Sequence, residues 1–101
     1  MNKRLIMRIT GANKYKPTAK QIELVKQNFE QIKDFIKKPI SFKAKIGADS
    51  FTFDLKTGVF KYRVCQEGES IEQNIEEAFA NLANYLKKLN QTVDFKDYER
   101  E

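Results

Sequence analysis

The segment from Ser70 to Asn90 (SIEQNIEEAFANLANYLKKLN) constrains the fold of this chain more than any other. Its large apolar residues recur at spacings of three and four: Ile71, Ile75, Phe79, Leu82, Leu86 and Leu89. This spacing predicts one apolar stripe along an α-helix. Ser70 with Gln73 predicts an N-terminal capping box, and Asn90 can end the helix in a left-handed conformation. The stripe lasts only about three heptads, so a helix packed on a sheet is favoured over a coiled coil.

A second amphipathic helix is predicted to begin at Pro17 or Thr18. Thr18 and Gln21 have the spacing of another capping box. The apolar stripe that follows consists of Ile22, Val25, Phe29, Ile32 and Ile36. Pro39 should stop this helix, because proline disfavours helical geometry in the residue before it.

Residues 40–47, 51–56 and 59–65 alternate apolar and polar side chains, the pattern of half-buried strands. Short turn sequences separate them, at 48–50 and 57–58, so they predict an antiparallel meander. Residues 3–10 predict one more strand, with Leu5, Met7 and Ile9 on one face and Arg4, Ile6 and Arg8 on the other. We therefore expect a single α+β domain over residues 1–101. Its order is β-α-β-β-β-α, with an antiparallel three- to four-stranded sheet and two amphipathic helices on one face.

The end of the chain has a weaker pattern. Residues 91–101 contain an alternating Val93 and Phe95 before the sequence becomes charged. We expect this segment to add a short edge strand or to cover one end of the core. Residues 96–101 are expected to form a frayed tail.

Several classes of function are excluded by what the sequence lacks. It has no histidine, so the commonest general base and transition-metal ligand is missing. Its single cysteine, Cys65, cannot form an internal disulfide, and we interpret it as an inert strand residue in a cytoplasmic protein. No apolar run approaches the ~20 residues that span a membrane. The sequence therefore predicts a protein that is not an enzyme and has no cofactor, metal site or membrane segment.

Charge is divided unevenly along the chain. Residues 1–66 hold 15 Lys/Arg against 5 Asp/Glu, whereas residues 67–101 hold 4 against 9. The acidic part begins just before the predicted helix at Ser70, where we expect a partner-binding surface made by Glu69, Glu72, Glu76 and Glu77. Favourable interaction with the helix dipole, together with solubility, is the simpler explanation of the same residues.

The polar side of the predicted meander is a basic sheet face. Strand alternation places Lys43, Lys45, Lys56, Lys61 and Arg63 there, interrupted only by Asp54. Such a face could bind phosphates, together with Lys14 and Tyr15 in the preceding loop. Protection of the strands against edge-to-edge aggregation is the alternative explanation.

Two resemblances bear on function. The element order over Thr18 to Asn90 is similar to that of the double-stranded-RNA-binding domain. That family contacts phosphates with lysines at the start of its last helix; this chain has Glu69-Ser70-Ile71-Glu72 there, so its function is not transferred. In composition, the chain also resembles small Lys/Ile/Asn/Phe-rich proteins of phages and mobile elements.

The hypothesis that follows is a non-catalytic binding module acting through protein–protein contact. It would be a phage- or mobile-element-encoded inhibitor or regulator of a host complex, of the anti-CRISPR kind, whose partner is a protein or a protein–nucleic acid complex. The alternative is a nucleic-acid-binding protein that uses the basic sheet face.

Overall fold

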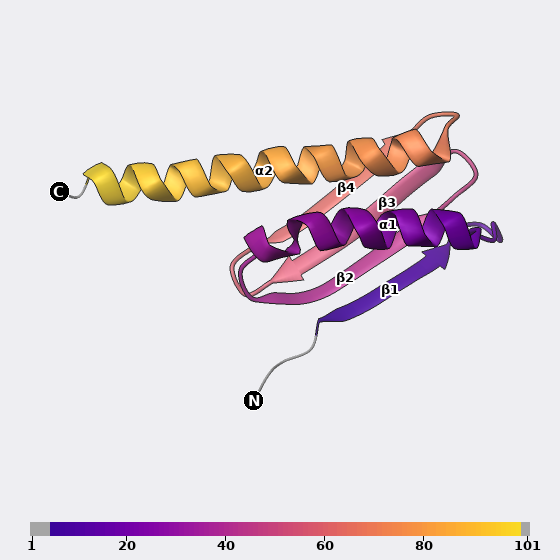
Figure 1. Cartoon of the computed structure of the whole chain (residues 1–101), viewed down its shortest axis with the longest axis horizontal. Helices are drawn as coiled ribbons and strands as arrows, with labels where there is room; N and C mark the ends of the chain where they lie inside the picture. Colours follow the sequence, from indigo (N-terminus) through magenta and orange to yellow (C-terminus); the bar gives the residue numbers. More distant parts are fainter. Residues whose placement is uncertain (1–4, 100–101) are drawn as a thin grey trace.

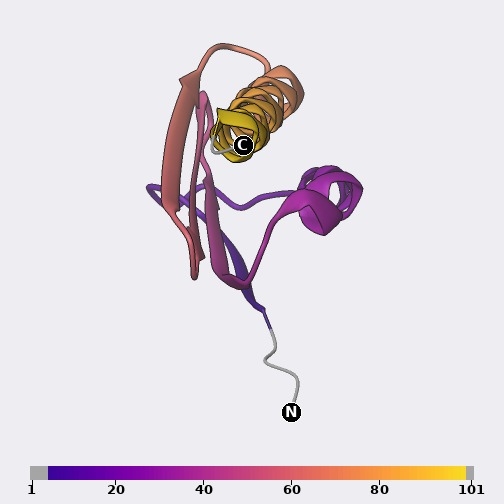
Figure 2. The same ribbon diagram turned by 90° about the vertical axis from the view of Figure 1, so that its left-hand side faces the viewer.

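Two helices lie side by side on one face of a four-stranded sheet, and the other face of the sheet is uncovered (Figures 1 and 2). The computed structural model describes the backbone of residues 5–99 and the side chains of residues 5–89. The elements are β1 (Ile6–Gly11), α1 (Ala19–Ile32), the 3₁₀ turn η1 (Lys33–Phe35), β2 (Pro39–Ile46), β3 (Ser50–Thr57), β4 (Lys61–Glu67) and α2 (Ile71–Glu99). The predicted fold class and element order are confirmed.

The strands are arranged in the order β1-β2-β3-β4. The pairs β2–β3 and β3–β4 are antiparallel, as the short turns predict, but β1 runs parallel to β2. This pair departs from the expected all-antiparallel sheet. The chain leaves β1 and returns to β2 through α1, and such a helical crossover joins parallel strands.

Strand alternation separates the two faces of the sheet. Side chains of β2 and β3 that face the helices are almost completely buried, among them Phe42, Ile46, Phe51, Phe53 and Leu55. Phe42 and Phe53 lie with ring centroids 5.0 Å apart, and Phe79 of α2 stacks on Phe53 at 5.1 Å. From α1, Phe29 closes the core at 4.7 Å from Phe42. The core is therefore an aromatic layer between helices and sheet.

Both helices start at the predicted caps. The Thr18 hydroxyl accepts the Gln21 backbone N–H at 3.1 Å, and the Gln21 side chain accepts the Thr18 N–H at 3.0 Å, which completes the capping box. At α2, the Ser70 hydroxyl accepts the Gln73 N–H at 3.2 Å. The Gln73 amide donates to Glu77, one turn further along the helix.

The end of α2 differs from the prediction. The helix does not end at Asn90 but continues to Glu99, so residues 91–99 form no edge strand. At 1.5 Å per residue, 29 residues make a helix of about 43 Å, longer than an eight-residue strand of about 27 Å. Its C-terminal part consequently extends past the sheet (Figure 1). The frayed tail predicted for 96–101 stays a prediction, since residues 100–101 lie outside the described residues.

Candidate nucleic-acid interface

The strand register brings cations from all four strands onto the uncovered side of the sheet, here called the open face. Its central row is Arg8, Lys43, Asp54 and Arg63, which are successive partners across the sheet. One flanking row is Ile6, Ser41, Lys56 and Lys61, and the other is Thr10, Lys45, Thr52 and Cys65. A further row at the end of β4 pairs Ser50 with Glu67, so six cations and two carboxylates share this face.

The predicted basic sheet face is thus brought together by the fold. Lys43, Lys45, Lys56, Lys61 and Arg63 are all exposed. Neighbouring strands lie about 4.8 Å apart and alternate residues along a strand about 6.7 Å apart, so the cations form a lattice. A lattice of this density can meet several phosphates of one nucleic acid at once.

Arg8 is the member of the open face that sequence reasoning missed. The alternation along residues 3–10 predicts that Arg8 lies on the other face of its strand from Met7 and Ile9. It does not predict which strand pairs with this one in the sheet. The parallel register sets Arg8 beside Lys43. Arg4, predicted for the same face of this strand, lies outside the described residues.

One of the two carboxylates, Asp54, lies at the centre of the open face. Asp54 Oδ1 lies 3.7 Å from Arg63 Nε, and the two side chains remain 54 % and 73 % exposed. Shallow hollows of about 420 Å³ and 490 Å³ lie on the two sides of the central row, and Lys43, Asp54 and Arg63 line both. An incoming ligand would therefore touch the carboxylate as well as the cations.

Aromatic side chains of the strands face the helices. Phe42, Phe51 and Phe53 are buried, and Tyr62 packs against Tyr85 of α2 with centroids 4.8 Å apart. Burial, and secondarily the neighbouring Tyr85, raise the pKa of the Tyr62 phenol above its ordinary value. The open face consequently lacks, among the described strand residues, the stacking platform that single-strand binders use.

The loop residues predicted to assist the site have different positions. Tyr15 is half-buried, and its hydroxyl donates a hydrogen bond to the Gln21 side chain at 3.1 Å. This contact attaches the loop to the first turn of α1. Lys14 is exposed and adopts a left-handed conformation with φ 66°. Tyr15 is therefore not presented as a stacking aromatic.

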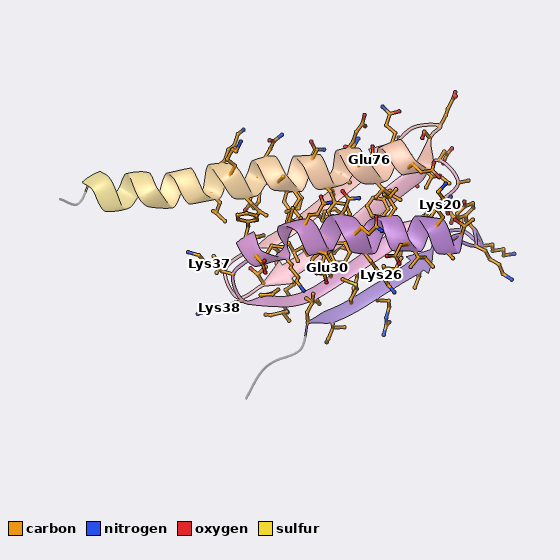
Figure 3. All side chains as sticks on the ribbon, in the orientation of Figure 1. Lys20, Lys26, Glu30, Lys37, Lys38 and Glu76 are labelled. Carbon is orange, nitrogen blue, oxygen red and sulfur yellow. The ribbon has the colours of Figure 1, made fainter. Side chains whose placement is uncertain are left out.

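The four predicted partner-binding glutamates lie on or next to α2, away from the open face. Glu69, Glu72, Glu76 and Glu77 are all exposed, and Glu77 accepts hydrogen bonds from Gln66 and Gln73. The helix layer carries both signs of charge, with Glu76 on α2 and Lys20 and Lys26 on α1 (Figure 3).

Other chemistry has little support within the described part of the chain. Cys65 is exposed on the open face beside Thr52. Among the described residues, no three His, Cys, Asp or Glu side chains gather as a metal site would require. The helices of this part are also too short or too polar to cross a membrane.

Comparisons with known proteins give the fold relatives of this arrangement. No protein-family model matches the chain, and no curated protein is significantly similar in sequence. Among solved structures, the N-terminal domain of Thermus thermophilus Protein Y is similar, with a TM-score of 0.73 and 14 % identity, over 85 % of this chain and 99 % of that one. A ribosomal subunit interface protein from Coxiella burnetii has a TM-score of 0.73 and 12 % identity, over 84 % and 97 %. At these identities the likeness shows a shared fold.

The comparisons also correct the functional hypothesis. The prediction of a phage- or mobile-element-encoded inhibitor, acting by protein–protein contact in the manner of an anti-CRISPR protein, is wrong. The structural neighbours of the chain are Protein Y and a ribosomal subunit interface protein. Composition misled the prediction, because a small Lys/Ile/Asn/Phe-rich chain without catalytic groups is compatible with many functions.

Proposed function

We propose that this protein is a ribosome-associated domain that binds ribosomal RNA through the open face of its sheet. The observation that carries the proposal is the convergence of six cations from four strands on the one uncovered sheet face. Phosphate contacts from Lys and Arg supply most of the sequence-independent affinity of nucleic-acid binders. The shared fold with a ribosomal subunit interface protein supports the ribosome as the source of that RNA.

The proposed role is binding without catalysis. The chain has no histidine, and its one cysteine is exposed on a strand rather than enclosed in a site. The protein would act by binding ribosomal RNA and so occupying a surface of the ribosome that other ligands need. A ribosome-bound protein would work in the cytoplasm, which is the compartment expected from its cysteine content.

Sedimentation with ribosomes tests this proposal directly. The full chain is mixed with purified ribosomes and with separated subunits at low salt, and each is run through a sucrose gradient. We expect the chain to travel with ribosomal particles and to leave them as salt is raised.

Two triple variants then locate the surface. Arg8→Gln, Lys43→Gln and Lys45→Gln together remove three charges from the open face. Lys20→Gln, Lys26→Gln and Lys37→Gln together make the same change in net charge on exposed residues of the helix side (Figure 3). Only the first triple variant should fail to sediment with ribosomal particles. A wild-type chain that stays at the top of the gradient at low salt would refute the proposal.

A further inference from the structure

The cations of the open face form two groups, here called strips, on the two sides of a gap at Thr52 and Asp54 of β3. The first strip is Arg8, Lys43 and Lys45 on β1 and β2, and the second is Lys56, Lys61 and Arg63 on β3 and β4. Between the strips, the central strand presents Thr52 and Asp54, which are cross-strand neighbours of Lys45 and Lys43. Lys56 follows Asp54 by two residues on the same strand, so the gap between the strips is confined to Thr52 and Asp54. The second carboxylate of the face, Glu67, lies at the end of β4, beyond Arg63 and Cys65.

A carboxylate in this position does not suit a phosphate. It carries the same sign of charge and, when ionised, is only a hydrogen-bond acceptor. A phosphodiester chain that crossed β3 would meet Asp54 directly. Two phosphodiester chains, one over each strip, would instead leave Asp54 facing whatever lies between them.

The width of the face limits which nucleic acid can do this. Strands β2 and β4 are two strand spacings apart, about 10 Å, and β1 and β4 about 14 Å. The minor groove of B-form DNA is only about 6 Å wide and about 7.5 Å deep, so a sheet cannot reach its floor, and it displays no 2′-hydroxyl groups. Its major groove is about 12 Å wide but about 8.5 Å deep, and a four-stranded sheet is too broad to enter it.

The minor groove of A-form RNA fits both requirements. It is wide and shallow, and it displays 2′-hydroxyl groups between its phosphate chains. A hydroxyl can donate to a carboxylate, and the Asp54 side chain is 54 % exposed in the middle of the face. Arg63 lies beside it at 3.7 Å and is also free to reach the neighbouring phosphates.

We propose that the open face binds the minor groove of double-stranded RNA, with one strip on each phosphate chain and Asp54 accepting a 2′-hydroxyl as the RNA-specific contact. This inference rests on the proposed function and refines it, because it selects duplex segments of ribosomal RNA as the ligand. Asp54 is then a specificity-determining residue. The buried aromatics of the strands agree with this choice, since unpaired bases would need exposed rings to stack on.

The test compares four probes by fluorescence anisotropy at fixed salt. They are an RNA hairpin with a long stem, a DNA hairpin of the same sequence, the RNA hairpin with 2′-O-methyl groups in its stem, and an unpaired RNA of equal length. The wild type should bind the RNA hairpin most tightly. Methylation should weaken binding, because it removes the donor hydrogen.

Three substitutions assign the discrimination to one side chain. Asp54→Ala should lower the ratio of RNA-hairpin to DNA-hairpin affinity by about tenfold, the size of one hydrogen bond to a charged group. Asp54→Asn keeps a neutral acceptor and should restore part of that ratio. The control Glu76→Ala removes an exposed carboxylate from the helix layer and should leave the ratio unchanged.

The outcomes separate this inference from the proposed function. If Asp54→Ala raises the affinity for RNA and DNA hairpins equally, the carboxylate acts only through its charge and the inference is overturned. Equal binding of unpaired and hairpin RNA by the wild type also overturns it, although ribosomal RNA binding would stand. Loss of binding to every RNA, together with absence from ribosomal particles, would instead refute the proposed function.

Discussion

Salt dependence offers the most quantitative test of the open face. Each phosphate neutralised by a cation releases counterions, so the logarithm of affinity falls linearly with the logarithm of salt, with a slope of about −0.9 per contact on a duplex. The register places six cations on the open face. If each meets one phosphate, the slope is about −5, and affinity should fall by roughly 10³ between about 50 mM and about 200 mM salt.

The first strip supplies half of these contacts. Arg8→Gln, Lys43→Gln and Lys45→Gln together should halve the slope, so that the same salt range costs only about 40-fold. All three side chains are exposed, so the fold should be retained, which far-ultraviolet circular dichroism can verify. The assay is anisotropy titration of a labelled RNA hairpin at several salt concentrations.

The control keeps the change in net charge and alters only its position. Lys20→Gln, Lys26→Gln and Lys37→Gln together should preserve the wild-type slope. Lys20 and Lys26 lie on α1 and Lys37 in the connection to β2, so none of them belongs to the rows of the open face (Figure 3). Equal slopes for the two triple variants would mean that net charge, rather than the lattice on the sheet, governs binding. In that case the open face would not be the surface that binds the RNA.

Three further predictions concern the scaffold. Phe53→Ala should cost about 3–5 kcal/mol of unfolding free energy in urea, because Phe53 is fully buried among four other rings, whereas exposed Val59→Ala should cost under about 0.5 kcal/mol. Thr18→Ala should cost about 1 kcal/mol by removing the capping box at α1, a loss that Thr18→Ser should largely avoid. The pKa of Tyr62 is raised in the fold from 10.0, so the unfolded chain ionises first and stability is lost as pH rises through the folded value. Tyr62→Phe should therefore lose less stability than the wild type between about pH 9 and about pH 11 in thermal melts, and equal losses would contradict this assignment.

Much of the fold follows from local patterns in the sequence. The 3.6-residue stripe of Ile75, Phe79 and Leu82 and the two-residue alternation of β2 to β4 each define one apolar face. Because an apolar face must be buried, these patterns indicate helices on one side of a sheet and a polar side opposite. They also place Lys43, Lys45, Lys56, Lys61 and Arg63 together, since side-chain direction in a strand has a period of two.

The sequence alone did not settle where α2 ends. Asn90 has the chemistry of a helix terminator, yet the helix continues to Glu99. A capping residue only makes termination favourable; it does not prevent the next residues from adopting helical geometry. The residue at which a helix ends is therefore harder to predict from sequence than the existence of the helix.

Only the tertiary structure decided which strand lies beside β1, and with it the composition of the site. Parallel pairing with β2 depends on the path of the chain through α1. It joins residues 35 apart in the sequence, such as Arg8 and Lys43, and no local pattern encodes such a contact. That pairing adds Arg8 to the first strip. Likewise, the Tyr15 hydroxyl is hydrogen-bonded to the Gln21 side chain at the start of α1. Tyr15, which the sequence predicts as an aromatic contact to nucleic acid, therefore contributes to the structure of the domain instead. Local periodicity determines which way a side chain faces, but which side chains become its neighbours is determined by contacts distant in sequence.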